Sequence, residues 1–171
     1  MRWLALILAF IATTVCAEVR DPGTHFFQAK FGNLKEDLAT ARQEGKTGIL
    51  LMFEMDECPF CHRMKTTVLN QSTVQDYYRK HFLVYPMDVK GDATLTDFQG
   101  KETTEKAFSL EQRARATPVF IFYDLDGKAM TRFTGATQNA DEFMLLGRYV
   151  VEGAYKNAPF NVYRRAAPSG K

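Results

Sequence analysis

The sequence predicts a single α/β domain in which a central mixed β-sheet is flanked by helices. Short runs of β-branched and aromatic residues, typical of buried strands, recur at residues 49–53, 82–88 and 119–123. Segments with helical periodicity stand around them, near residues 34–42, 59–69, 72–80, 103–114 and 140–155. We expect the domain to cover residues 33–157, with an N-terminal extension at residues 18–32 and a flexible C-terminal tail at residues 158–171.

The first 17 residues have the pattern of a secretory signal peptide. Arg2 supplies the positive charge, eight apolar residues run from Leu4 to Ile11, and Val15-Cys16-Ala17 offers a cleavage site before Glu18. Because the apolar run is too short to span a bilayer comfortably, we expect export without stable membrane insertion. The alternative is an uncleaved N-terminal anchor.

Cleavage simplifies the cysteine content and leaves the charge nearly balanced. Of the three cysteines, Cys16 leaves with the signal, so no structural disulfide competes for Cys58 and Cys61. Removal of Arg2 leaves 21 basic against 20 acidic residues, which almost cancel, so the composition indicates no nucleic-acid partner. About 154 residues remain, which is enough for one domain with its own core.

The extension and the first helix precede the first strand. Asp21-Pro22-Gly23 predicts a turn, and Phe26, Phe27 and Phe31 are expected to anchor the extension by packing. Asn33 is suited to cap a helix, and the apolar spacing after it predicts an amphipathic helix to about residue 42.

The strongest chemical signal follows the strand at residues 49–53, which leads into Cys58-Pro59-Phe60-Cys61. Pro59 suits a first helical position, and apolar residues recur at helical spacing up to Leu69, so strand, dithiol and helix should succeed one another. Cys58 would then lie at the exposed N-terminus of a helix, where unpaired N–H groups and the helix dipole favour a thiolate. Cys61, one turn further in, is near enough to close a disulfide.

Two later helices have predicted capping boxes, formed by Ser72 with Gln75 and by Asn139 with Glu142. Pro86 removes a hydrogen-bond donor from the strand at residues 82–88, which predicts a sheet edge or a bulge.

The segment at residues 90–101 is expected to be an inserted loop or short hairpin. It is either a place for partner selectivity or a surface insertion without consequence. The helix at residues 103–114 should bury a stripe made of Ala107, Leu110 and Ala114. After the strand at residues 119–123, a turn at residues 124–127 and a second strand near residues 128–133 predict a hairpin.

The Cys58-Pro59-Phe60-Cys61 motif, together with Thr117-Pro118 at the head of the strand at residues 119–123, resembles the thioredoxin superfamily. In that family the proline is cis, faces the dithiol and helps to hold an extended peptide. The resemblance covers roughly Asn33 to Tyr155 and implies a thioredoxin-like fold. The chain is most similar to SoxW-type periplasmic thioredoxins, through its acidic stretch before the dithiol, Gly91-Asp92 and Gly153-Ala154-Tyr155.

Two positions depart from the family's pattern. A typical thioredoxin has a tryptophan just before its first cysteine and a buried aspartate six residues before it, where this chain has Glu57 and Met52. The departure concerns how the proton of Cys61 is handled and how reducing the couple is. Glu54, Asp56 and Glu57 should oppose a thiolate if they lie close to it, which argues against a strongly oxidising couple.

The resemblance implies an exported protein thiol–disulfide oxidoreductase, and we predict a reductase of protein disulfides in the periplasm. Cys58 would be the nucleophile and Cys61 the resolving cysteine, with Thr117 and Pro118 shaping the substrate-binding surface. Pro59, Phe60 and His62 are expected to tune the balance between dithiol and disulfide.

No metal is expected, and no cofactor beyond the redox-active disulfide of Cys58 and Cys61. The expected substrate is a disulfide in a periplasmic protein. A reductase outside the cytosol would draw its electrons from a membrane thiol carrier of the DsbD or CcdA type, which the resemblance also implies.

Other functions use the same residues. Cys58-x-x-Cys61-His62 is also the attachment signature of a c-type haem, although the strands around it and the Thr117-Pro118 pair argue against a haem domain. A disulfide isomerase or oxidase remains an alternative, as does a chaperone or binding module whose activity does not need the dithiol. A structural zinc site is disfavoured because there is no second cysteine pair.

Overall fold

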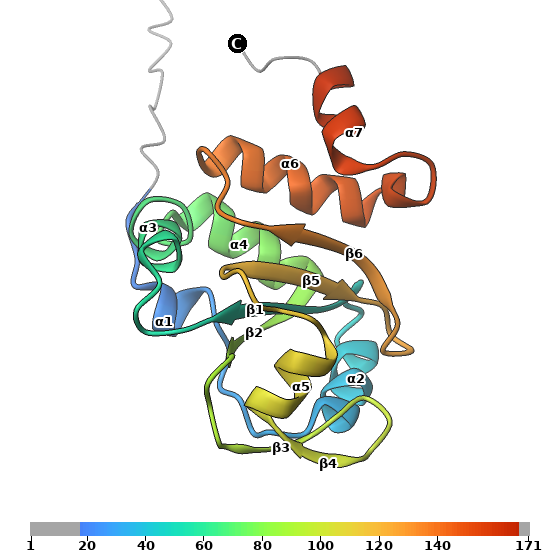
Figure 1. The fold of residues 1–171 in the computed structure, drawn as a ribbon. Coiled ribbons are helices and arrows are strands. Elements are labelled where there is room, and N and C mark those ends of the chain that lie inside the picture. Colours follow the sequence, from blue (N-terminus) through green and yellow to red (C-terminus); the bar gives the residue numbers. More distant parts are fainter. Residues whose placement is uncertain (1–17, 168–171) are drawn as a thin grey trace, which may run out of the picture.

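The computed structural model describes residues 18–167, so the predicted signal peptide at residues 1–17 lies outside the described residues. Four strands form the main sheet in the order β2-β1-β5-β6 (Figure 1). They are β1 (Gly48–Glu54), β2 (Phe82–Asp88), β5 (Val119–Tyr123) and β6 (Ala129–Thr134). β2 runs parallel to β1, whereas β5 is antiparallel to both β1 and β6, so the sheet is mixed as the sequence predicts.

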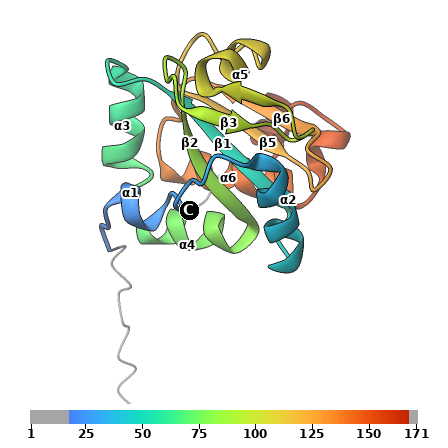
Figure 2. The same cartoon turned by 90° about the horizontal axis from the view of Figure 1, so that it is seen from below.

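Helices cover both faces of this sheet. One face carries α1 (Pro22–His25), α3 (Pro59–Thr67), α4 (Ser72–His81) and α6 (Ala140–Val151), and the other carries α2 (Leu34–Gln43) and α5 (Glu105–Glu111). Figure 2 shows α1 beside α4 on the first face, with α3 next to them. The chain therefore forms helix–sheet–helix layers around a single sheet.

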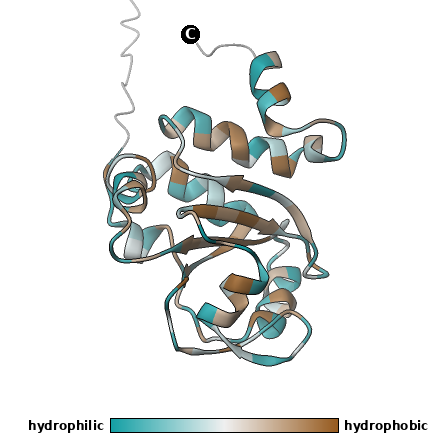
Figure 3. Cartoon of the chain, in the orientation of Figure 1, coloured by the Kyte–Doolittle hydropathy of each residue, from teal (hydrophilic) through white to brown (hydrophobic). Residues whose placement is uncertain are grey.

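The central strands are hydrophobic on both faces because both faces are covered. Leu50 and Met52 of β1 point into the core on the α3, α4 and α6 side, whereas Ile49, Leu51 and Phe53 point into the core on the α2 and α5 side. In Figure 3, β5 is coloured as hydrophobic along its length. The uninterrupted apolar runs of the sequence thus correspond to strands buried on two sides.

β2 is the edge strand that Pro86 predicts, and its exposed backbone groups are covered by the N-terminal extension. The Gln28 side chain accepts a hydrogen bond from Val84 N at 2.6 Å, and Gln28 N donates to Val84 O at 2.9 Å. Lys30 Nζ donates to Pro86 O at 3.0 Å. The extension therefore seals the sheet edge.

The extension is also packed into the core. Phe26 is fully buried and Phe27 is 6% exposed, as predicted, but Phe31 is 87% exposed and the prediction that it anchors the extension is wrong. Phe31 stands where the chain turns away from β2 toward α2, and its side chain is left outside the core. The backbone of Arg20 also donates to Asn70 O at 2.7 Å, tying the extension to the segment after α3.

The insertion forms a hairpin of β3 (Thr94–Thr96) and β4 (Glu102–Thr104). Leu95 is fully buried and Phe98 is 7% exposed, so both belong to the core on the α2 and α5 side. Asp97 is buried and accepts hydrogen bonds from the backbone of Gln99 and Lys101, which stabilises the turn. The insertion is therefore a structural part of the layer formed by α2 and α5, which lies below the sheet in Figure 1 and is called the lower layer.

Several local predictions differ from the structure. The N-cap of α4 is Gln71, with no side-chain capping bond, and Gln75 instead donates to the carbonyls of Arg20 and Leu69. α5 is shorter than predicted and buries Glu105, Phe108 and Ser109, leaving Leu110 53% exposed. The helix begins after Thr104, which pairs with Thr94 in the hairpin and accepts a hydrogen bond from Ala107 N.

The C-terminal segment, which the sequence predicts to be a flexible tail over residues 158–171, contains a helix in its described part. A 3-10 turn at Ala154–Lys156 follows α6, and α7 (Phe160–Ala166) then folds back onto it. Phe160 packs edge-on against Phe133 and beside Tyr149, with ring centroids 5.8 and 5.4 Å apart. Within residues 18–167, no helix is both long enough and apolar enough to cross a membrane.

Candidate active site

Cys58 and Cys61 form a disulfide at the start of α3, with their Cα atoms 5.2 Å apart. Cys58 is the N-cap of the helix, and its sulfur accepts a hydrogen bond from Cys61 N at 3.1 Å. Pro59 takes the first helical position, where its missing N–H has no intrahelical partner to lose. The sequence thus places the sulfur of Cys58 where backbone N–H groups stabilise negative charge.

Both cysteines are buried, at 3% and 2% exposure, whereas the sequence leads us to expect an exposed Cys58. The loop before α3 folds back on itself, with Cys58 N donating to Met55 O at 3.2 Å. The disulfide consequently packs into the core with Met52 and Met64. Phe60, between the two sulfurs in sequence, is 60% exposed and forms the surface of this region.

The Thr117–Pro118 peptide bond is cis, which confirms the prediction of its geometry. β5 begins at the next residue, and Val119 pairs with Phe53 near the end of β1. Because α3 starts just beyond that end of β1, Thr117 and Pro118 lie at the same end of the sheet as the disulfide. Pro118 is buried, and the hydroxyl of Thr117 is buried without a hydrogen-bond partner within residues 18–167.

The acidic residues before the dithiol have cationic partners. Both carboxylate oxygens of Glu54 lie within 2.8 Å of Lys65 Nζ, and Glu57 accepts from Lys90 Nζ at 2.9 Å. The hydrogen bond from Lys90 lowers the pKa of Glu57. Glu54 and Glu57, two of the three carboxylates before the dithiol, therefore oppose a Cys58 thiolate less than the sequence indicates.

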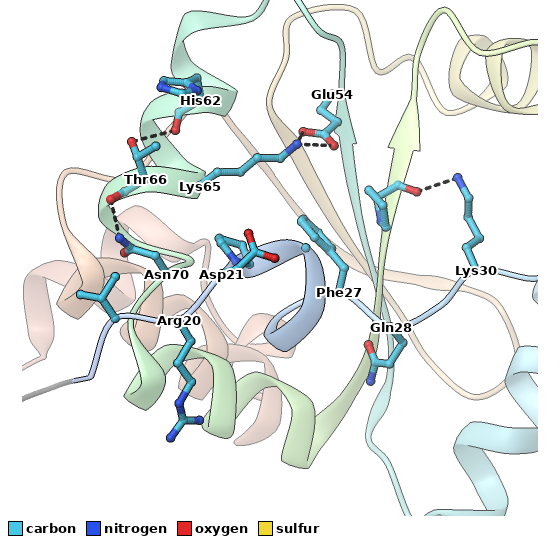
Figure 4. Close-up of a pocket in the computed structure, with 14 residues that line it drawn as sticks. Arg20, Asp21, Phe27, Gln28, Lys30, Glu54, His62, Lys65, Thr66 and Asn70 are labelled. Carbon is cyan, nitrogen blue, oxygen red and sulfur yellow. Dashed lines mark hydrogen bonds and ion pairs between the residues drawn. The ribbon is translucent and has the colours of Figure 1, made fainter.

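A pocket of about 720 Å³ lies between α3, the end of β1 and the N-terminal extension (Figure 4). His62, Lys65 and Thr66 line it from α3, and Glu54 lines it from β1. His62 is exposed at the pocket, and Figure 4 shows it on the turn of α3 above Lys65. Within residues 18–167, no three His, Cys, Asp or Glu side chains gather as a metal site would require.

Lys65 and its pairing with Glu54 are the features of this site that the sequence interpretation missed. Lys65 stands four residues after Cys61, and Glu54 two residues after Met52. These spacings place each residue on the same face of its element as the earlier one, so they could have drawn attention to the pair. That the two faces meet follows only from the packing of α3 against β1.

A disulfide across a Cys-x-x-Cys motif at a helix N-terminus, on this mixed sheet, defines the class of thioredoxin-like thiol–disulfide oxidoreductases. A family model described as a thioredoxin-like domain matches residues 34–150. The chain belongs to that family. A search among curated proteins found no match to this sequence.

Solved structures agree on the fold. A thioredoxin-fold protein from Helicobacter pylori superposes with a TM-score of 0.62 at 18% identity, over 82% of this chain and 91% of that one. The DsbH oxidoreductase gives 0.57 at 17% identity, over 90% and 96%. A thioredoxin from Thermus thermophilus gives 0.55 at 26% identity, over 72% and 88%.

Proposed function

We propose that the protein is exported and reduces disulfides of partner proteins in the periplasm, using Cys58 and Cys61. The observation that carries this proposal is the disulfide at the N-terminus of α3, beside the exposed Phe60 and at the same end of the sheet as Thr117-Pro118. Such a pair stores two electrons and exchanges them without any other cofactor.

Cys58 is the attacking cysteine in this proposal. Its burial differs little from that of Cys61, so exposure does not distinguish the two. The position of Cys58 at the helix cap distinguishes the two cysteines. Its sulfur accepts a hydrogen bond from Cys61 N, and it would accept that bond more strongly as a thiolate. The Cys58 thiolate attacks one sulfur of the substrate disulfide, forming a mixed disulfide and releasing the other sulfur as a thiolate.

Cys61 then completes the reaction. Its sulfur attacks Cys58 Sγ, the bond between Cys58 and the substrate breaks, and the second substrate sulfur leaves as a thiolate that takes up a proton. The substrate gains two electrons and two protons, and the protein is left with the disulfide seen in the structure. Thr117 and Pro118 shape the surface on which the substrate chain lies, and Pro59, Phe60 and His62 adjust the balance between the two forms.

The direction of transfer is proposed as reduction. Asp56 is exposed on the loop before Cys58, so negative charge adjoins the dithiol. A strong oxidant requires a strongly stabilised dithiol form, which a thiolate can provide. Negative charge near the dithiol disfavours that thiolate and so argues against a strong oxidant. Electrons would come from a membrane thiol carrier of the DsbD or CcdA type, since a reductase must be reduced again after each turnover.

Two cysteine variants test the order of attack. We expect Cys58→Ser to abolish reduction of insulin, because no thiol remains at the helix cap. Cys61→Ser should accumulate mixed disulfides with its substrate, detected as an added mass that a thiol reductant removes. Equal residual turnover in the two variants would contradict the order, and activity that survives in Cys58→Ser would point to a chaperone or binding module.

The redox potential tests the direction. We would titrate the mature protein against a thiol–disulfide buffer and count free thiols by alkylation. A potential near about −270 mV supports a reductase, whereas one near about −120 mV would make the protein an oxidant. A Soret band together with thiols that never react would instead indicate a covalently attached haem.

Export is tested by expressing the full chain in a bacterium and measuring the mass of the product outside the cytosol. Cleavage after Ala17 leaves a chain that begins at Glu18. A full-length mass in the membrane fraction would favour the uncleaved anchor.

A further inference from the structure

The resolving step requires Cys61 to lose a proton, because the thiolate is the attacking species. Cys61 is 2% exposed and packs among Met52, Met64 and Val68. Apolar burial disfavours a thiolate, so a base close to Cys61 would accelerate the step. The question is which side chain of the described residues supplies it.

Met52, a residue of β1 that packs in the core with the cysteines, cannot act as this base. Met52 is fully buried in the same core as the disulfide, and it pairs in register with Pro86 of β2. Neither side chain binds a proton. The base must therefore come from the border of this core rather than from beneath the disulfide.

Glu54 lies at that border. It stands two residues after Met52, so its side chain leaves β1 on the same face, toward α3. Lys65 stands one helical turn after Cys61, on the same side of α3. The two meet in an ion pair, with the Glu54 carboxylate only 15% exposed (Figure 4).

The pair also has a route to solvent. Glu54 and Lys65 both line the pocket of about 720 Å³, which opens beside α3. A proton received by Glu54 can pass to water there without crossing the core. Partial burial on the α3 side of β1 and contact with a pocket that holds solvent suit a carboxylate that transfers a proton.

We propose that Glu54 accepts the proton of Cys61 during resolution and that Lys65 positions its carboxylate. In this step the Cys61 S–H bond breaks and the proton moves to Glu54, directly or through one water. The Cys61 sulfur forms its bond to Cys58 Sγ, and the electron pair of the Cys58–substrate bond leaves with the substrate sulfur. Glu54 then returns the proton to solvent through the pocket.

Other charged groups line the same pocket as the Glu54 carboxylate or pair in register with its residue. They come from α3, from the N-terminal extension and from β2, whose last residue pairs with Glu54: His62, Lys65, Arg20, Asp21, Lys30 and Asp88. Lys65 is the one that contacts Glu54 directly. Its removal should therefore alter the resolving step more than removal of any other.

This inference rests on the proposed order of attack, and a two-phase assay separates the two claims. The reduced protein is mixed with a nitrobenzoate disulfide, whose thiolate product is coloured. Attack by Cys58 releases the first product in a step that depends on reagent concentration. Resolution by Cys61 releases the second in a step that does not.

We expect Glu54→Gln to slow the second phase by at least about tenfold near neutral pH and to leave the first phase within about threefold. Its second-phase rate should rise about tenfold per pH unit up to the ionisation of the thiol, whereas the rate of the unmodified protein depends weakly on pH. Glu54→Asp should restore part of the rate, and Lys65→Met should slow the second phase because the Glu54 carboxylate loses the ion pair that positions it.

Glu57→Gln is the matched control. It removes the same charge three residues further on, in the loop after β1, but its carboxylate is 70% exposed and pairs with Lys90 on the surface. Its second phase should match that of the unmodified protein. Thermal unfolding of the oxidised variants checks that each is folded.

The outcomes distinguish the claims. A second phase that is unchanged in Glu54→Gln overturns the role of Glu54, and so does an equal slowing in Glu57→Gln, which would indicate a general effect of charge. A fast first release from Cys58→Ser overturns the order of attack itself. A slower second phase with an unchanged pH profile would assign Glu54 a structural role only.

Discussion

Phe26 provides a direct test of whether the N-terminal extension is part of the folded domain. Its ring is fully buried and contacts Phe27, Tyr78 and Phe143, with centroid separations of 5.1, 5.7 and 6.2 Å. Phe26→Ala removes a whole ring from a core that cannot collapse around the space. Such substitutions cost about 3–5 kcal/mol, through lost hydrophobic burial and the cavity that remains.

That loss is a large fraction of the stability of a domain of this size, which is typically about 5–15 kcal/mol. It corresponds to a fall in Tm of roughly 6–20 °C, given about 2–4 °C per kcal/mol for a domain of this length. The assay is urea and thermal unfolding of the oxidised protein produced from Glu18 onward, followed by circular dichroism.

Phe31→Ala is the control, because it removes the same ring from the same extension at a position that is 87% exposed. We expect a change within about 0.5 kcal/mol. Equal and small losses in both variants would refute the reasoning, since the extension would then contribute nothing to the core. Equal and large losses would show that exposure in the structure does not determine the cost.

Two further variants test the lower layer. Leu95→Ala, in the inserted hairpin, should cost about 2–5 kcal/mol in urea unfolding because Leu95 is fully buried, whereas Lys90→Ala should leave the midpoint unchanged; a harmless Leu95→Ala would make the insertion a surface loop. Burial raises the pKa of Asp37, and a hydrogen bond from Tyr85 offsets part of that rise. The folded state therefore favours the protonated carboxyl. The stability that this gives is present below the unfolded-state pKa of about 4 and is lost as pH rises through the folded-state pKa. Asp37→Asn should therefore gain stability relative to the unmodified protein as pH rises from about 4 toward 7, and a constant difference across that range would contradict this.

Local patterns were sufficient for the chemistry-bearing elements. The helix cap at Asn33 and the helix start at Pro59 follow from interactions within a few residues of each position. Such interactions depend on residue type and spacing alone, so the sequence determines them. The Cys58–Cys61 spacing belongs to the same group, whereas the cis bond before Pro118 was expected from the resemblance to the thioredoxin superfamily.

Predictions that depended on which side of an element faces the core were less successful. Leu110 and Phe31 are apolar yet exposed, while Glu105 is buried and paired with Lys30. An apolar residue is buried only if another element covers it, and the sequence does not state which elements meet. Likewise Gln75 bonds to Leu69 and to the distant Arg20 instead of capping its own helix.

The sequence by itself determined the dithiol, the strand–helix junction that carries it and the family to which the chain belongs. Tertiary structure alone decided that Cys58 is buried, and that Glu54 of β1 meets Lys65 of α3 beside a pocket. The physical reason is that burial and ion pairing arise between elements distant in sequence. They depend on how α3 and the N-terminal extension pack against the sheet, which no local spacing specifies.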